Sequence, residues 1–157
     1  MEKVLFICVH NSARSQMAEA YLNAFGGGEF VAESAGFEPT AINPIVVEAM
    51  KEEGIDLSGH KTQSAFDLYK EGRMFSYVIT VCEESVEKQC PVYPGMTHRL
   101  HLPFPDPAEV QGTHEEKLAQ VRVIRDRIKD VVYEFLEWAR SGDIKKLSDF
   151  WEIRPLS

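Results

Sequence analysis

Short apolar runs alternate with longer amphipathic stretches along the first half of the chain. The apolar run at residues 4–7 predicts a buried strand, because it is short and polar turn residues follow it at once. Residues 13–25 then place apolar side chains every three or four positions, which is the spacing of a helix with one buried face. A strand over residues 30–33 and a helix that begins near Pro44 follow. This half therefore predicts strand, helix, strand and helix.

The same alternation continues in the second half. Residues 64–69 fit a short helix, residues 75–81 form the clearest strand pattern in the chain, and residues 99–104 form a weaker one. A long helix is expected from Glu115 to about Ala139, with one apolar stripe that packs against a sheet. The stripe consists of Leu118, Val121, Ile124, Ile128, Val131, Val132 and Phe135.

Strands that alternate with helices are typical of a parallel α/β sheet. We therefore predict a single-domain α/β fold with a four-stranded parallel sheet, flanked by helices on both faces and wound as in flavodoxin. Such sheets bind ligands beyond the carboxyl ends of their strands. Cys8 and Cys82 each directly follow a predicted strand, so they are candidate functional residues.

Composition narrows the class of protein. A chain of 157 residues can bury the core of one domain, and its net charge of −8 argues against a nucleic-acid partner or an anionic membrane surface. No stretch approaches the roughly 20 apolar residues of a membrane span, and the N-terminal apolar run is too short for a secretory leader. Three cysteines, an odd number, suit a reducing compartment. We therefore expect a cytoplasmic protein.

The loop from Cys8 to Arg14, called the anion loop below, has the composition of an anion site. A loop of this length can curl around a tetrahedral oxyanion with several backbone N–H groups turned inward. The start of the following helix adds the positive end of its dipole, and Arg14 adds a bidentate guanidinium contact. The predicted substrate-binding residues are Val9, His10, Asn11, Ser12, Ala13 and Arg14.

The same positive field stabilises a thiolate, which makes Cys8 the expected nucleophile. Ser15 can donate a hydrogen bond to that sulfur atom. Asn11 is expected to buttress the loop through its side chain, and His10 is expected to lie at the rim. The alternative is that Cys8 is simply a small buried residue at the end of a strand.

Cys82 and Cys90 offer a second kind of chemistry. If the ends of the two strands lie side by side, Cys82 can reach an adduct on Cys8, and three thiols can pass two electrons along a chain of disulfides. Two alternatives remain open: both cysteines are inert, or they form a zinc site with His98 and His101. The seven residues between Cys82 and Cys90 exceed the usual zinc spacing.

Asp106 lies between Pro105 and Pro107 in a rigid loop. A carboxylic acid there can protonate an oxygen as it leaves the oxyanion. Asp-Pro pairs also form ordinary turns, so the catalytic role depends on the presence of the anion loop.

The sequence resembles the low-molecular-weight protein tyrosine phosphatase superfamily, and within it the thioredoxin-coupled arsenate reductases. The residues that carry the resemblance are the run from Cys8 to Glu19, Ser34-Ala35-Gly36, the run from Val78 to Cys82, Cys90-Pro91 and Phe104-Pro105-Asp106-Pro107. It extends from about residue 3 to residue 138. We therefore expect a domain at residues 1–139 and a C-terminal tail of unknown role at residues 140–157.

The resemblance implies that Cys8 attacks arsenate, for which phosphate or sulfate is a mimic, while Arg14 binds its oxygens and Ser15 supports the thiolate. Asp106 assists loss of hydroxide or water. Cys82 attacks the adduct on Cys8 and releases arsenite, Cys90 then attacks Cys82, and thioredoxin reduces the resulting pair. No nucleic acid and no membrane are expected as partners.

Three positions favour the reductase branch over the phosphatase branch. Phosphatases of this family usually carry proline where Gln16 stands, a second cysteine where Ala13 stands, and tyrosines after the Asp-Pro pair, where this chain has Ala108 and Glu109. The alternatives are a phosphatase that hydrolyses phosphomonoesters through a phosphocysteine at Cys8, and a non-enzymatic oxyanion or redox sensor.

The resemblance also bears on metals. Some family members bind a potassium ion near residues that match Asn11, Glu19 and Ser34. The aspartate that completes that site has no match around Gln63. We therefore predict no metal ion and no cofactor.

Overall fold

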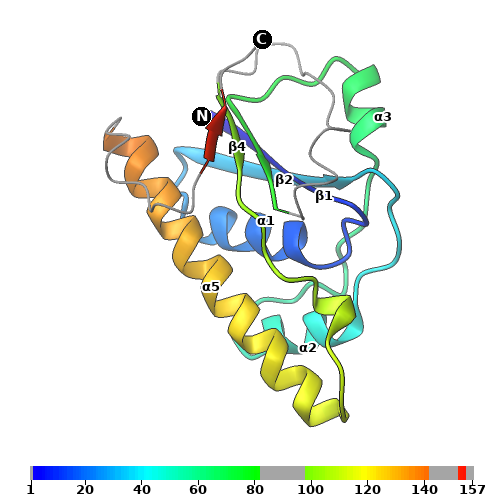
Figure 1. Ribbon diagram of the computed structural model, residues 1–157. Coiled ribbons are helices and arrows are strands. Elements are labelled where there is room, and N and C mark those ends of the chain that lie inside the picture. The colour runs from blue at the N-terminus through cyan, green and yellow to red at the C-terminus, as the bar shows by residue number, and fades with distance from the viewer. Residues whose placement is uncertain (1, 82–97, 142–151, 155–157) are drawn as a thin grey trace.

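The computed structural model describes residues 2–81, 98–141 and 152–154. Its centre is one five-stranded sheet with the strand order β2-β1-β3-β4-β5 (Figure 1). The strands are β1 (Glu2–Cys8), β2 (Phe30–Gly36), β3 (Tyr77–Thr80), β4 (His98–His101) and β5 (Glu152–Arg154). The first four are parallel, which confirms the predicted fold class. The short β5 is antiparallel to β4 and was not predicted.

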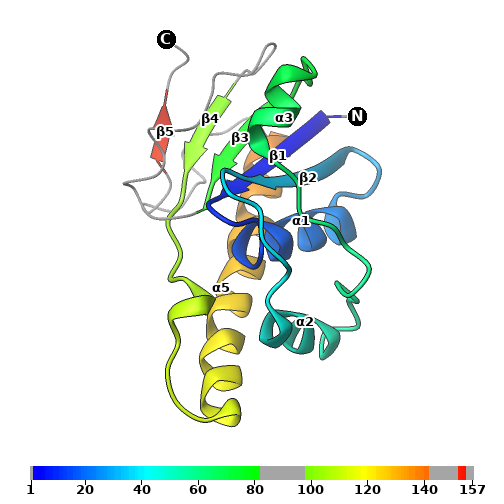
Figure 2. The same cartoon turned by 90° about the vertical axis from the view of Figure 1, so that its right-hand side faces the viewer.

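Helices cover both faces of the sheet. They are α1 (Arg14–Phe25), α2 (Pro44–Lys51), α3 (Ala65–Lys70) and α5 (His114–Ser141), with a short 3₁₀ turn, η1 (Pro107–Glu109). Helices α1 and α5 pack together on one face, with α2 against the N-terminal part of α5. Helix α3 lies on the opposite face (Figure 2). None of the helices in the described ranges is long and apolar enough to cross a membrane.

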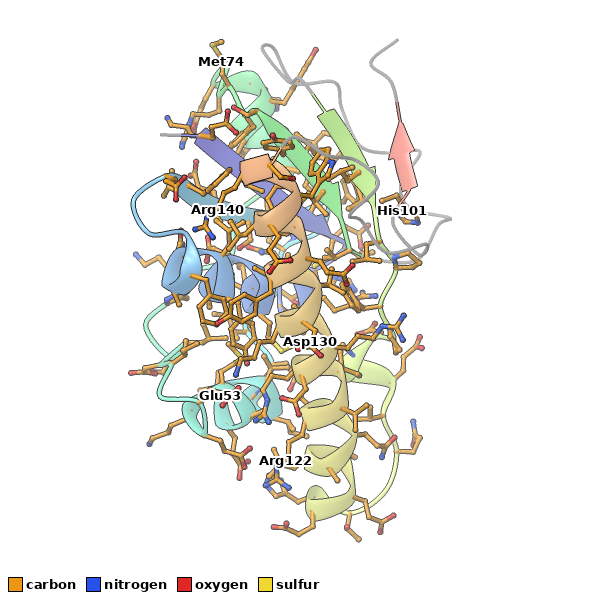
Figure 3. The ribbon with its side chains drawn as sticks, turned by 90° about the vertical axis from the view of Figure 1, so that its left-hand side faces the viewer. Glu53, Met74, His101, Arg122, Asp130 and Arg140 are labelled. Atoms are coloured by element: carbon orange, nitrogen blue, oxygen red, sulfur yellow. The ribbon has the colours of Figure 1, made fainter. Side chains whose placement is uncertain are left out.

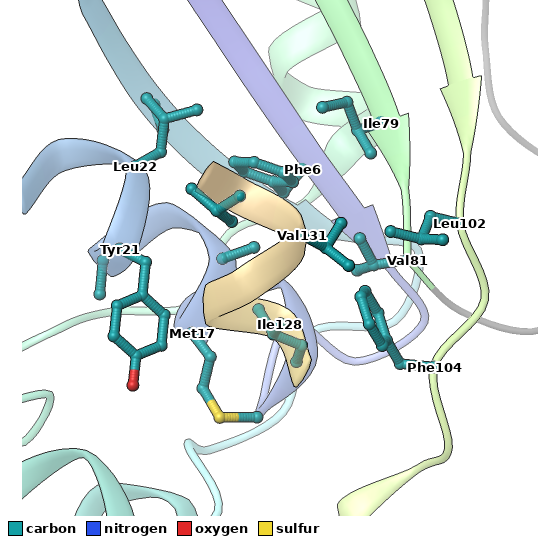
Figure 4. Close-up of a cluster of buried hydrophobic side chains, with 14 of the residues drawn as sticks. Phe6, Met17, Tyr21, Leu22, Ile79, Val81, Leu102, Phe104, Ile128 and Val131 are labelled. Carbon is teal, nitrogen blue, oxygen red and sulfur yellow. The ribbon is translucent and has the colours of Figure 1, made fainter. Parts of the chain in front are cut away.

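The main core lies between the sheet and the pair α1 and α5 (Figure 4). The apolar stripe predicted for the long helix is buried along its whole length. Phe6 and Ile79 meet this stripe from the sheet, and Met17 and Leu22 meet it from α1. At about 1.5–3 kcal/mol for each fully buried large apolar side chain, this layer holds the two helices in fixed positions on the sheet.

A smaller core lies under α3, on the other face. It consists of Leu5, Ile7, Ala35, Phe37, Ala65, Leu68, Phe75 and Val78. Alternate residues of β1 therefore face opposite cores, as parallel strands with covered faces require. Ion pairs join α5 to the segment after α2, in the region where Figure 3 labels Glu53 and Arg122. In one of them Lys129 Nζ lies 3.0 Å from Glu53 Oε1.

The winding of the sheet brings three strand ends together. Strand β1 lies between β2 and β3, so the chain leaves it toward one neighbour and returns on the other side. That reversal is the place where doubly wound sheets bind ligands. The amide of Val81, just past β3, donates to the carbonyl of Ile7 at 2.9 Å, which continues the β1–β3 pairing to the last residue before Cys8.

The C-terminal segment contributes to the sheet. Helix α5 ends at Ser141, and the chain returns to place β5 beside β4, with Leu100 opposite Ile153. Strand β5 therefore covers the outer edge of β4, and an uncovered edge is a site where sheets aggregate.

Candidate active site

The anion loop joins the end of β1 to the start of α1. Its carbonyl groups accept hydrogen bonds from the segment that follows β2: Glu38 donates to Val9, Thr40 to His10 and Asn43 to Ser12, at 2.8–3.0 Å. In one peptide group the C=O and the next N–H point in opposite directions. Because the carbonyls face outward to this segment, the amides that follow them face the inside of the loop, as an anion site requires.

Two backbone features hold this curl. Asn11 has a positive φ of 54°, a conformation that asparagine tolerates better than most residues. Gly36, at the end of β2, lies against the back of the loop. A Cβ atom there would lie 2.7 Å from the Asn11 nitrogen and 2.7 Å from the Val9 oxygen. Only glycine allows β2 to approach the loop this closely.

Two groups lie within hydrogen-bond distance of the Cys8 sulfur atom. The Asn11 amide donates to Cys8 Sγ at 3.2 Å, and Ser15 Oγ lies 3.0 Å from the same sulfur. The Asn11 side-chain amide donates to Ser15 Oγ at 2.8 Å, which occupies a lone pair of the hydroxyl. Either atom of the Ser15–Cys8 contact can be the donor in the thiol form, whereas the Ser15 hydroxyl is the donor when Cys8 acts as a thiolate, because a thiolate has no hydrogen to give.

Arg14 begins α1 and closes the mouth of the loop. Ala13, at the N-cap, makes no side-chain capping bond, so the first amides of α1 stay open to an anion. Arg14 is 5 % exposed, and its guanidinium donates to the Phe104 carbonyl at 3.0 Å and lies 3.8 Å from Asp106 Oδ2. A buried, oriented guanidinium beside these amides gives an acidic protein a local site for an oxyanion.

Asp106 precedes η1 and lies beside Arg14. Its Oδ1 atom accepts the amide of Ala108 at 2.9 Å, which orients the carboxylate, while Oδ2 faces the guanidinium. The carboxylate keeps about a quarter of its surface exposed. One oxygen is therefore structural, and the other is available for proton transfer at the mouth of the loop.

A layer of buried polar side chains lies behind the anion loop. Asn11 Oδ1 accepts from Gln16 Nε2 at 3.2 Å and from the Gln63 amide at 3.0 Å. The side chain of Gln63 also donates to the Ser34 carbonyl at 2.8 Å. Asn11 thus links the loop to the end of β2 and to the segment before α3. The sequence pointed to Asn11, and it pointed to Gln63 only as a position without the aspartate of a potassium site; the contact between the two residues, 52 positions apart, was not predicted.

Glu19 lies one turn further along α1, next to this layer. Burial raises the pKa of its carboxyl group to about 7, although hydrogen bonds from Ser34 act in the opposite direction. His60 Nδ1 lies 3.6 Å from Glu19 Oε2 at the protein surface. Glu19 is thus a carboxyl group that changes charge near neutral pH.

The structure brings together most of the predicted site. Cys8, Asn11, Arg14, Ser15 and Asp106 converge at the mouth of the loop, and His10 is tied at its rim by a bond to the Glu38 carbonyl at 3.0 Å. Gly36 was not predicted as a site residue, although it belongs to the Ser34-Ala35-Gly36 motif that carries the family resemblance.

The predicted relay cysteines, Cys82 and Cys90, lie outside the described residues. In the described part of the chain no three His, Cys, Asp or Glu side chains form a metal-binding group. His101, one of the suggested zinc ligands, is buried in β4 with its Nδ1 2.7 Å from Thr80 Oγ1.

An open hollow of about 530 Å³ adjoins the anion loop. His10 and Ser12 line it on the loop side, and Ile42, Ile45 and Val110 line it on the other sides. No aromatic ring of phenylalanine, tyrosine or tryptophan is among the described residues that line it. The hollow thus lacks the stacking surface that a phosphotyrosine ring prefers.

The chain belongs to the low molecular weight phosphotyrosine protein phosphatase family, whose model matches residues 3–146. Within that family, it is 40% identical over 135 residues to the arsenate reductase of Bacillus subtilis, an alignment that covers 85% of this chain and 94% of that protein. The chain is thus an enzyme of this family, and its similar relatives include reductases.

Two solved structures have the same fold. An arsenate reductase in the phosphate-binding state is 26% identical, with a TM-score of 0.67 over 87% of this chain and 98% of that one. The thioredoxin-dependent arsenate reductase of Corynebacterium glutamicum is 29% identical, with a TM-score of 0.65 over 91% of this chain and 63% of that one.

Proposed function

We propose that this enzyme reduces arsenate to arsenite through Cys8, Cys82 and Cys90, and that thioredoxin reduces the final disulfide. The observation that carries the proposal is the 2.9 Å bond from the Val81 amide to the Ile7 carbonyl. These residues directly precede Cys82 and Cys8. Neighbouring strands lie about 4.8 Å apart, so Val81, which precedes Cys82 in the sequence, lies close to Ile7, which precedes Cys8, and this makes Cys82 our candidate for the second thiol.

The first step is attack of the Cys8 thiolate on the arsenic atom. The inward amides of the anion loop and Arg14 bind the arsenate oxygens, and the Asn11 amide and the Ser15 hydroxyl donate hydrogen bonds to the attacking thiolate. Asp106 Oδ2 donates a proton to the departing oxygen, which leaves as water. The product is an arsenic(V) ester of Cys8.

The second step transfers two electrons. The Cys82 thiolate attacks the Cys8 sulfur, the sulfur–arsenic bond breaks, and its electron pair stays on arsenic, which departs as arsenite. Cys8 and Cys82 are then a disulfide. Cys90 attacks Cys82 and frees Cys8 as a thiolate, and the dithiol of thioredoxin reduces the Cys82–Cys90 pair. The names of the Bacillus and Corynebacterium relatives support this assignment, and its need for a thiol reductant fits the cytoplasm.

Hydrolysis of phosphomonoesters is the second candidate. It requires Cys8, Arg14 and Asp106, all of which converge in the described site, and neither Cys82 nor Cys90. The described lining of the hollow beside the loop includes no phenylalanine, tyrosine or tryptophan, which disfavours a phosphotyrosine ring. A phosphatase and a reductase thus share the first attack and differ in the fate of the adduct on Cys8.

One assay separates these functions. The protein is given arsenate, thioredoxin, thioredoxin reductase and NADPH, alongside its Cys8→Ser, Cys82→Ser and Cys90→Ser variants. We expect arsenate-dependent NADPH consumption that each substitution abolishes. Full turnover in Cys82→Ser excludes the relay. Rapid hydrolysis of an aryl phosphate without arsenate-dependent NADPH use identifies a phosphatase, and inactivity in both assays identifies an oxyanion or redox sensor.

A further inference from the structure

The polar layer behind the anion loop is saturated by donors of the protein itself, two from side chains and one from the backbone amide of Gln63. Asn11 Oδ1 has two lone pairs, and both are used by N–H donors, from Gln16 at 3.2 Å and Gln63 at 3.0 Å. Asn11 is completely buried. Its side-chain oxygen therefore has no lone pair left for a further ligand.

Gln63 also occupies the carbonyl oxygen of Ser34. Its side-chain Nε2 donates to that oxygen at 2.8 Å, so a polarised N–H₂ group lies between β2 and the anion loop. Potassium is held by several oxygen atoms that replace its hydration shell. A donor group at this position both uses an oxygen and repels a cation.

Family members that bind potassium do so near residues that match Asn11, Glu19 and Ser34. In this chain Asn11 accepts a hydrogen bond from the backbone amide of Gln63, and Ser34 accepts one from its side chain, which carries no charge. The buried side-chain oxygen Oε1 of Gln16 is without a hydrogen bond within the described part of the chain, but this oxygen and the carboxyl group of Glu19 are two side-chain ligands, fewer than the several oxygens that hold potassium. The residues present therefore do not fit the ion.

We infer that Gln63 takes the place of a monovalent cation as the buttress of the anion loop, so that neither stability nor turnover responds specifically to potassium. The turnover part of the inference depends on the proposed function, and the stability part does not.

The test is thermal unfolding in KCl and in choline chloride at equal ionic strength. We expect the wild-type protein to unfold within about 1 °C of the same temperature in both salts. Gln63→Asp replaces the side-chain donor to the Ser34 carbonyl by a carboxylate and leaves the backbone amide that donates to Asn11, so we expect potassium to stabilise this variant. A rise of about 8 °C corresponds to a potassium concentration roughly 100-fold above its dissociation constant.

Gln111→Asp, the same change at an exposed position, is the matched control and should show no difference between the salts. A saturable stabilisation of the wild-type protein by potassium overturns the inference, and this measurement does not depend on whether the variant folds. A folded Gln63→Asp that ignores potassium overturns the role given to Gln63. Arsenate turnover in the two salts should agree within about twofold, and absence of any turnover refutes the proposed function while leaving the unfolding result intact.

Discussion

Gly36 is the position at which one added methyl group has the most specific effect. Its Cβ would lie 2.7 Å from the Asn11 nitrogen, 2.7 Å from the Val9 oxygen and 2.9 Å from the His10 carbonyl carbon. Ordinary van der Waals contact begins near 3.4 Å. In Gly36→Ala the backbone of the anion loop must therefore move by ~0.7 Å, since the obstacles are backbone atoms that cannot rotate away.

A displacement of this size alters the positions of the amides that face the oxyanion and of the Asn11 amide that faces Cys8. Misplacement of reacting groups by about 1 Å can cost 100-fold in rate. We expect kcat/KM for arsenate to fall by about 10- to 100-fold, which is about 1.4–2.7 kcal/mol of transition-state stabilisation. Crowding should also lower the free energy of unfolding by about 1–3 kcal/mol.

Two further alanine substitutions separate activity from stability. Gly26→Ala places its Cβ 2.8 Å from the carbonyl oxygens of Leu22 and Phe30, away from the site, so it should destabilise the fold while kcat/KM changes less than about twofold. Gly59→Ala has open space around it and should change neither. Coupled NADPH oxidation and urea unfolding measure the two quantities. Normal kcat/KM in Gly36→Ala, or an equal loss in Gly26→Ala, refutes this account.

Three other substitutions test single contacts. Glu19→Gln removes the carboxyl group whose pKa is raised to about 7 in the folded protein. Because the fold favours the protonated form of that group, the free energy of unfolding of the wild-type protein should fall by up to about 3 kcal/mol relative to the variant as pH rises from 4.5 to 7. Urea unfolding at several pH values measures this difference. Asp106→Asn keeps the bond from the Ala108 amide but cannot donate the same proton, so kcat for arsenate should fall about 100-fold or more with unchanged stability. Ser15→Ala removes one donor from Cys8 and the acceptor of Asn11, so iodoacetamide should alkylate Cys8 more slowly at neutral pH, followed by mass spectrometry of the labelled peptide.

Each of these has a clear contrary result. Parallel pH profiles of stability for the wild-type protein and Glu19→Gln show that this carboxyl group titrates normally. An unchanged kcat in Asp106→Asn shows that another group supplies the proton. An unchanged alkylation rate in Ser15→Ala shows that the Asn11 amide and the helix dipole alone stabilise the thiolate.

Hydrophobic spacing was sufficient to predict most of the fold. The long helix was predicted within two residues at each end, because its apolar stripe repeats over many turns. The strand at residues 75–81 was predicted too long: β3 is assigned only from Tyr77 to Thr80, because strand length depends on which neighbours pair with it. Strand β5 could not be predicted, since it has three residues and exists through its pairing with β4.

The anion loop was predictable because its chemistry is local in sequence. Cys8, Arg14 and Ser15 lie within one strand–loop–helix unit, and an anion at a helix start needs only that unit. The supports from Gln63 and Gly36 are distant in sequence and act through an amide and through the absence of a side chain. Such contacts depend on how β2 and the segment before α3 meet the loop, which no periodicity encodes.

The outward hydrogen bonds of the loop carbonyls, to Glu38, Thr40 and Asn43, mean that the anion loop is shaped before any ligand arrives. A loop already shaped for a tetrahedral oxyanion binds phosphate as readily as arsenate, since the two ions share charge and shape. Selection between them then cannot occur at binding and has to occur in the chemistry, because arsenic accepts an electron pair from thiols and phosphorus does not. If the chain reduces arsenate as proposed, phosphate competes with arsenate for the anion loop, and the rate of reduction depends on the ratio of the two ions.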